Sequence, residues 1–414
     1  MPMNDASAPR ACAKGNAVDR YRIHVPDAVL ADLNARLERT RFPDYFSEGG
    51  WDMGIDVPYI RELAAYWRSE FDWRAYEDRL NRLPHYTTTI DNQNIHFIHV
   101  RSPHPNALPL LIVHGWPGSV IEFLGVIDRL ADPPRGGGEE RQAFHLVIPS
   151  LPGYGFSGPT RERGWNIERT ARAFAELMRR LGYRRYGAQG GDWGAFVTTR
   201  LAELDEPRIV GLHTNMPVAP APEQPGDLTG EEVQRLKQFE EHMARETGYA
   251  RIQGTKPQTI GLALNDSPAG LLGWIVEQFR NWSDCGGDVE SVFSRDDLIA
   301  NVMTYWVTRT AASAARFYFE NHLPGMDVPD GAARVSVPTG VARFPKELVL
   351  MPRAWLERRY NIVHWTEMDR GGHFAAMEQP ELFADDVTKF FTALRKLSIA
   401  TRHTGSGQAS APSN

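Results

Sequence analysis

The pentapeptide at residues 190–194, Gly-Gly-Asp-Trp-Gly, is the segment of this sequence that most clearly suggests chemistry. It follows a strand-like run, residues 185–189, and precedes a segment of helical spacing, residues 195–204. A strand that turns at once into a helix, with small residues around the central one, is the pattern of a nucleophile elbow. Here the central residue is Asp192, where the usual motif has serine.

An aspartate at this position favours a particular class of reaction. A carboxylate is poorly suited to acyl transfer, but it can displace a leaving group at sp³ carbon and form an alkyl ester. Epoxides and alkyl halides are substrates of this kind. The simpler alternative is that Asp192 only caps the helix that follows it.

Three further features occur in an order that favours catalysis. His-Gly-Trp-Pro-Gly at residues 114–118 follows a buried-strand pattern and offers backbone N–H groups for an oxyanion hole. His373 follows two glycines in a late loop, where it can act as a general base. Glu347 lies between Asp192 and His373 in the chain and can orient the histidine. The order nucleophile, acid, histidine is that of α/β-hydrolases.

Each feature also has an ordinary structural interpretation when it is taken singly. The glycine-rich loop can be a plain strand exit, His373 a structural histidine, and Glu347 a solvated carboxylate. Asp327, Asp330 and Asp369 compete with Glu347 for the acid role. Asp369 ranks lower because it is too close to His373 in sequence to come from a separate strand end.

The elements that must position these residues alternate between strands and helices. Strand-like runs at 108–113, 144–148, 185–189 and 209–213 are separated by helical segments at 120–130, 166–181 and 195–204. This alternation predicts a mostly parallel central sheet flanked by helices. Strand patterns return at 335–341 and 362–367, before a helix at 380–397. A hairpin is expected around residues 91–94.

The largely helical block between the two strand-rich parts is interpreted as a lid over the strand ends, where open α/β sheets bind ligands. The predicted division is a disordered N-terminus (1–20), an N-terminal wrapping segment with the first hairpin (21–105), the first part of the core (106–217), a helical lid (218–322), the second part of the core (323–400) and a disordered tail (401–414).

Composition excludes several other classes of protein. The 414 residues carry a formal net charge of −6 without a basic run, which argues against nucleic-acid binding. Only Cys12 and Cys285 are present, far apart, so a disulfide is not expected and a reducing compartment fits. Neither a signal peptide nor a long apolar segment occurs. The sequence therefore predicts a soluble, cytoplasmic protein.

Beyond these patterns, residues 21–397 resemble the microsomal-type epoxide hydrolases of the α/β-hydrolase superfamily. Residues 114–119 look like the family's HGxP motif, residues 153–157 like its G-x-G-x-S/T segment, and residues 190–194 like its elbow. Residues 337–347, which end in Glu347, look like its strand and acid loop. The mammalian members carry an N-terminal membrane anchor, and no such anchor is expected in this sequence.

The resemblance also implies two lid tyrosines whose hydroxyls grip the epoxide oxygen. Tyr249 and Tyr318 lie in segments similar to those that carry them, and Tyr305 and Tyr360 are the nearest alternatives. Epoxide and water are then the partners, and neither a metal nor an organic cofactor is required. The backbone N–H groups of Trp116 and Trp193 are expected to form the oxyanion hole, with Trp116 also binding substrate.

Two other functions remain open at this point. A haloalkane or haloacid dehalogenase uses the same kind of nucleophile, and Trp193 could donate an N–H group to a halide. A non-catalytic, hydrolase-like binding protein would keep the elbow only as a scaffold. The oligomeric state is also open, a homodimer included.

Overall fold

The computed structural model describes residues 17–133, 141–220, 228–321 and 333–405. Within these residues, nine strands form one sheet in the order β1-β2-β3-β5-β4-β6-β7-β8-β9. The strands are β1 (Asp19–Tyr21), β2 (His85–Ile90), β3 (Gln93–Val100), β4 (Leu108–Val113), β5 (Phe144–Pro149), β6 (Tyr186–Gly190), β7 (Ile209–Thr214), β8 (Val335–Arg343) and β9 (Tyr360–Glu367). The β1–β2, β2–β3 and β3–β5 pairs are antiparallel, and all pairs from β5 to β9 are parallel. The carboxyl ends of β4, β6, β7, β8 and β9 therefore meet at one edge.

Apolar side chains on both faces of the central strands explain why helices cover the sheet on both sides. Leu111 and Val113 of β4 are buried in one core cluster, and Leu110 and Ile112 in another. The first cluster includes residues of α5 (Ile167–Arg180) and α6 (Trp193–Leu204). The second includes residues of α4 (Ile127–Ala131) and α15 (Pro380–Gly405). The predicted α/β class, with a mostly parallel sheet between helices, is confirmed.

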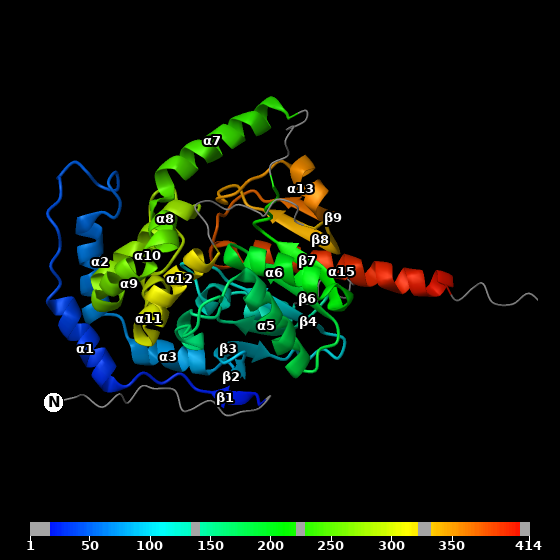
Figure 1. The fold of residues 1–414 in the computed structure, drawn as a ribbon, viewed down its shortest axis with the longest axis horizontal. Helices are drawn as coiled ribbons and strands as arrows, with labels where there is room; N and C mark the ends of the chain where they lie inside the picture. The colour runs from blue at the N-terminus through cyan, green and yellow to red at the C-terminus, as the bar shows by residue number, and fades with distance from the viewer. Residues whose placement is uncertain (1–16, 134–140, 221–227, 322–332, 406–414) are drawn as a thin grey trace, which may run out of the picture.

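A block of helices, called here the helical insertion, lies in the chain between β7 and β8 (Figure 1). It contains α7 (Gly230–Glu246), α8 (Gly248–Thr255), α9 (Pro257–Asp266), α10 (Pro268–Trp282), α11 (Arg295–Thr308) and α12 (Ala311–Glu320). The N-terminal segment supplies α1 (Asp27–Glu38), α2 (Val57–Ser69) and α3 (Trp73–Asn81), and α1 and α2 pack against α10. The short helices α13 (Arg353–Arg359) and α14 (Ala375–Glu378) belong to the second part of the core.

Several local predictions need correction. The expected disordered N-terminus, residues 1–20, is wrong for its last residues, because β1 pairs with the edge of β2. The expected disordered tail is wrong for residues 401–405, because α15 continues to Gly405, with no glycine or proline in the helix before that last residue except Pro380 at its start. The single helix expected at 120–130 is divided into the 3-10 helix η1 (Val120–Phe123) and α4. The hairpin turn is shorter than expected, with only Asp91 and Asn92 between the strands.

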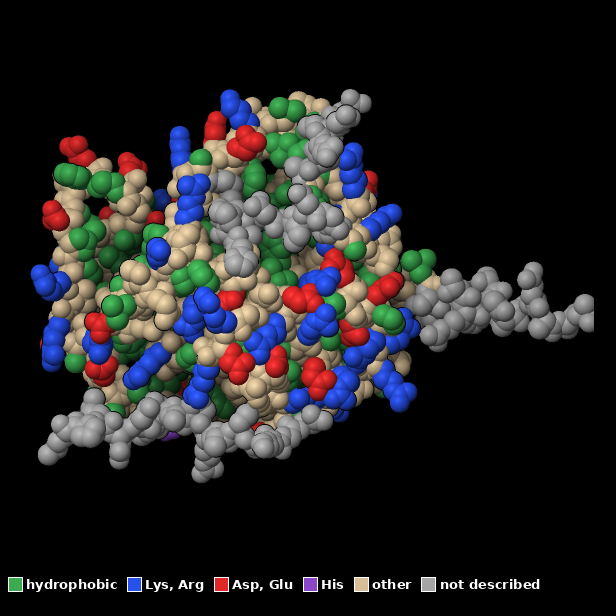
Figure 2. Space-filling view, viewed as in Figure 1, with side chains coloured by type: hydrophobic (Ala, Val, Ile, Leu, Met, Phe, Trp, Pro, Cys, Tyr) green, Lys and Arg blue, Asp and Glu red, His purple; other side chains and the backbone are tan. Residues whose placement is uncertain are grey.

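Basic and acidic side chains are interspersed over the face seen in Figure 2. No helix in the described part of the chain is both long enough and apolar enough to cross a membrane. Cys285 is a free, buried thiol, and Cys12 lies outside the described residues. Across the described ranges there is also no cluster of three or more His, Cys, Asp or Glu side chains that could hold a metal ion.

Candidate active site

Asp192 lies at a sharp turn between β6 and α6, as the sequence predicts. Its φ is 50° and its ψ is −132°, a strained conformation for a residue with a side chain. Gly190 and Gly194 allow the end of β6 and the start of α6 to approach each other closely. A β-carbon on Gly190 would fall 2.2 Å from the carbonyl oxygen of Gly194. The turn therefore holds the Asp192 carboxylate at the edge where the parallel strands end.

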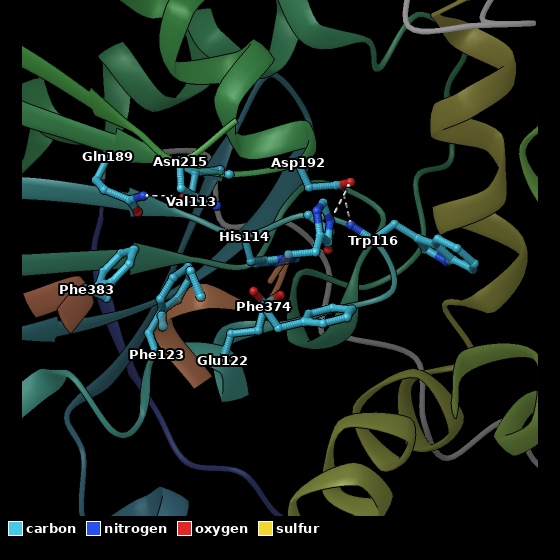
Figure 3. A pocket seen from close by; sticks show the side chains of 15 residues that line it. Val113, His114, Trp116, Glu122, Phe123, Gln189, Asp192, Asn215, Phe374 and Phe383 are labelled. Carbon is cyan, nitrogen blue, oxygen red and sulfur yellow. Dashed lines mark hydrogen bonds and ion pairs between the residues drawn. The ribbon is translucent and has the colours of Figure 1, made fainter. Parts of the chain in front are cut away.

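The loop after β4 holds one oxygen of this carboxylate. The backbone N–H of Trp116 donates to Asp192 Oδ1 at 2.8 Å (Figure 3). Helix α11 fixes the loop, since Asn301 Nδ2 donates to the carbonyl oxygen of Pro117 at 2.8 Å. Trp193 begins α6 directly after Asp192, so its backbone N–H is the second expected donor. This geometry is consistent with the predicted oxyanion hole.

His373 and Glu347 also come together with Asp192. Nε2 of His373 is 3.2 Å from Asp192 Oδ2, and its Nδ1 is 2.5 Å from Glu347 Oε1. His373 lies between β9 and α14, and Glu347 follows β8, so both come from the same edge of the sheet. Both side chains are buried, with 6% and 5% of their residue surfaces exposed.

The competing acids do not take this place in the described structure. Asp369 is exposed and forms an ion pair with Arg370 at 3.2 Å. Asp327 and Asp330 lie outside the described residues.

Two amides behind Glu347 were not predicted from the sequence. Asn215 Nδ2 donates to Glu347 Oε2 at 3.3 Å, and Gln189 Nε2 donates to Asn215 Oδ1 at 3.1 Å. The backbone N–H of Leu348 donates to the other Glu347 oxygen at 2.7 Å. The one available signal was that Asn215 directly follows a buried strand, β7. These bonds leave the Glu347 carboxylate fixed toward His373.

The charges around His373 set its protonation state. Burial alone would lower the pKa of this imidazole, but the negative charges of Glu347 and Asp192 and their hydrogen bonds outweigh it. The pKa of His373 is therefore raised well above its usual value. The imidazole is protonated between two carboxylates in this state of the protein.

Tyr249 on α8 and Tyr318 on α12 lie together on the insertion side of Asp192. The Tyr249 ring stacks on Trp116 with 4.9 Å between centroids, and Tyr318 packs edge-on against Trp193 at 4.8 Å. The two tyrosine rings are 5.9 Å apart. Burial, and in addition the charge of Asp192, raise the pKa of both hydroxyls above the usual value, so both stay protonated.

The alternative tyrosines have other partners. The hydroxyl of Tyr305 donates to the carbonyl oxygen of Gly118, and that of Tyr360 donates to the carbonyl oxygen of Val218 at 3.0 Å. Both phenols are buried, and each supports a backbone segment. Tyr249 and Tyr318, by contrast, pack against Trp116 and Trp193, the two residues expected to form the oxyanion hole.

Fold and side-chain arrangement together define an α/β-hydrolase with an aspartate at its elbow. Comparison with known proteins agrees with this class. The family model for the epoxide hydrolase N terminus matches residues 18–123, and the model for the alpha/beta hydrolase fold matches residues 109–252.

Three relatives make the relationship specific. A putative epoxide hydrolase of Stigmatella aurantiaca is 48% identical, over 91% of this chain and 85% of that protein. Epoxide hydrolase 1 of Sus scrofa is 38% identical, over 93% and 91%. The crystal structure of juvenile hormone epoxide hydrolase from the silkworm Bombyx mori superimposes with a TM-score of 0.85 and 33% identity, over 92% and 96%. The chain therefore belongs to the epoxide hydrolase family and is a hydrolase.

Proposed function

We propose that this enzyme converts epoxides to vicinal diols through a covalent ester on Asp192. The observation that carries the proposal is the position of the Asp192 carboxylate, which lies between the Trp116 N–H group and the His373–Glu347 pair. In the first step, a carboxylate oxygen attacks one epoxide carbon and the C–O bond of the ring breaks. Tyr249 and Tyr318 hydrogen-bond the ring oxygen, and one of them transfers its proton to it.

The second step hydrolyses this ester. Formation of the ester removes the negative charge of Asp192, which is one of the two charges that raise the pKa of His373. The imidazole then passes its proton to the tyrosinate that the first step left, and the neutral ring can accept a proton from water. The water oxygen bonds to the carbonyl carbon of the ester, and the oxyanion lies at the N–H groups of Trp116 and Trp193.

The ester bond then breaks, and the diol leaves with a proton from His373. The proton left on the restored carboxyl group of Asp192 passes to the neutral His373, which restores the carboxylate and the protonated imidazole. Overall, one epoxide and one water become one diol.

The proposed division of the chain follows from the same geometry. We interpret the helical insertion as a lid, because it supplies both tyrosines, and residues 21–105 as the segment that wraps the core. The insertion also helps to position the proposed base, because the carbonyl oxygen of Trp282 in α10 accepts the backbone N–H of His373 at 2.9 Å.

The experiment that tests the proposal is a single turnover of styrene oxide in ¹⁸O-labelled water with enzyme in excess. We expect the new oxygen of the diol to come from Asp192 and the label to enter the Asp192 carboxylate, as detected by mass spectrometry of the peptide. Label in the diol from this first turnover would exclude the ester route.

Halide release from alkyl halides remains the alternative reaction for the same nucleophile. The paired tyrosines and the family of the chain favour the epoxide. Measuring halide release and diol formation with the same preparation distinguishes the two. The relatives named above, which are epoxide hydrolases by name, argue against the non-catalytic alternative.

A further inference from the structure

A third carboxyl group, on Glu122, lies beside Asp192 and His373, and the mechanism above does not use it. Glu122 belongs to η1, directly after the loop that carries Trp116, and Figure 3 shows its carboxylate pointing toward that loop. Together with Asp192, Trp116 and His373, it lines a cavity of about 20 Å³. A polar cavity of this size holds about one water molecule.

The position of this carboxylate depends on Gly118. A β-carbon at residue 118 would fall 1.4 Å from Glu122 Oε1, so any larger residue displaces the carboxyl group. The backbone here is fixed from α11, because Tyr305 donates to the carbonyl oxygen of Gly118 and Asn301 to that of Pro117. Helix α11 and the loop after β4 place the Trp116 N–H group at Asp192, and the same two elements also hold Glu122 at the cavity.

The raised pKa of Glu122 suits a carboxyl group that binds water next to a developing negative charge. Burial raises the pKa of Glu122 to about 8, with His373 opposing the shift and Asp192 and Glu347 adding to it. These three groups, with the Tyr305 hydroxyl, are the titratable groups that act on it. At neutral pH the carboxyl group is mostly protonated, so it can bind water without repelling an oxyanion at the ester carbon.

We propose that Glu122 positions the hydrolytic water for attack on the Asp192 ester. Its carbonyl oxygen accepts one O–H of the water, while the other O–H faces Nε2 of His373 and a lone pair faces the ester carbon. His373 takes the proton, and Glu122 keeps its own throughout. This role rests on the proposed function and concerns only its second step.

The test separates ester formation from ester hydrolysis in rapid-quench single turnovers of styrene oxide, with the ester followed by mass spectrometry of the intact protein. In Glu122→Ala we expect the hydrolysis rate constant to fall by about tenfold or more, the effect of one lost hydrogen bond in the transition state. The rate constant for ester formation should change by less than about threefold. The ester should therefore accumulate. Glu381→Ala, which removes an exposed glutamate paired with Arg129, is the matched control.

Two further variants distinguish positioning from a structural effect. Glu122→Gln keeps a neutral carbonyl acceptor, so it should recover part of the lost rate and lack the decline above about pH 8 that ionisation of Glu122 gives the wild type. Gly118→Ala keeps the carboxyl group but displaces it, so it should also slow hydrolysis, with no further loss when combined with Glu122→Ala.

Wild-type hydrolysis in Glu122→Ala would overturn the inference, as would an equal loss in both steps without recovery in Glu122→Gln. Absence of any ester on wild-type Asp192 would instead contradict the proposed function.

Discussion

At the scale of single residues, the pKa of His373 connects the two proposed steps. Alkylation makes Asp192 neutral, and Asp192→Asn imitates this loss of charge in a stable protein. We therefore expect the pKa of His373 to be lower in Asp192→Asn than in the wild type, because the variant lacks a negative charge that stabilises the imidazolium. An NMR titration of the imidazole measures the shift. Asp369→Asn, at an exposed residue paired with Arg370, is the control. An unchanged pKa in Asp192→Asn would contradict the coupling.

The two tyrosines should affect only the opening of the ring. Tyr249→Phe and Tyr318→Phe each remove a protonated hydroxyl, so each should lower the rate constant of ester formation by roughly 10- to 100-fold. Ester hydrolysis should stay close to its wild-type rate, since neither hydroxyl takes part in it. Stopped-flow recording of tryptophan fluorescence can follow both steps. Tyr360→Phe is the matched control, because its hydroxyl bonds Val218 instead. If either variant slowed hydrolysis alone, its proposed role would be wrong.

Which site residues the sequence predicts depends on how locally they are specified. The elbow around Asp192 and the glycines before His373 are local motifs, so their positions were visible without a structure. Glu122 and Asn215 carry no such motif. Glu122 lies in a helix-like segment where a carboxylate normally faces solvent, but in the fold it is half-buried, with its carboxyl group against Gly118. Only the packing of distant segments reveals such a residue.

At the scale of elements, predictions were accurate where one pattern dominated. The continuous apolar run 108–113 gave the bounds of β4, since a strand buried on both faces has no polar residue to interrupt it. The helix expected at 120–130 is interrupted near Gly125, a poor helix former that packs against Pro380. Strand β1 has only three residues, too few to show alternation, so it was not predicted.

Helix α11 gives a prediction at this scale, because it anchors the loop that carries Trp116. Asn301 accepts the hydroxyl of Ser119 at 2.7 Å and donates to Pro117, and it is buried. Asn301→Ala should lower the free energy of unfolding by about 1–3 kcal/mol, since it leaves the buried O–H of Ser119 without its acceptor and the carbonyl oxygen of Pro117 without this donor. It should also slow ester hydrolysis, because the loop is no longer fixed.

Denaturant titration and single-turnover kinetics measure the two effects. Asn361→Ala, which removes an amide bonded to a backbone carbonyl at an exposed site, is the comparison. Equal stability losses in the two variants would show that α11 has no special part in holding the loop.

At the scale of the whole molecule, the N-terminal segment is tied to the helical insertion by side-chain bonds. Tyr66 and Tyr76 donate to Asp296 and Asp297 at the start of α11, at 2.9 and 2.7 Å. Arg36 bonds Asp266 at the end of α9. The segment therefore contacts helices of the insertion, and one of them, α9, packs against α12, which carries Tyr318.

The final prediction concerns the carboxyl-terminal helix and the stability of the whole fold. Asp386 of α15 is buried and bonds His213 of β7 at 3.0 Å and His364 of β9 at 2.9 Å. Burial favours the neutral carboxyl group, but the hydrogen bonds from the two histidines outweigh it and lower the pKa of Asp386 below its usual value. A depressed pKa contributes stability that is present above the unfolded pKa, about 4, and is lost as the pH falls below it. Asp386→Asn should therefore lower the free energy of unfolding by roughly 3 kcal/mol at pH 7. The difference from the wild type should shrink below about pH 4. Urea unfolding of both proteins across this pH range measures it, and a difference that stayed constant with pH would show that the charge of Asp386 does not stabilise the fold.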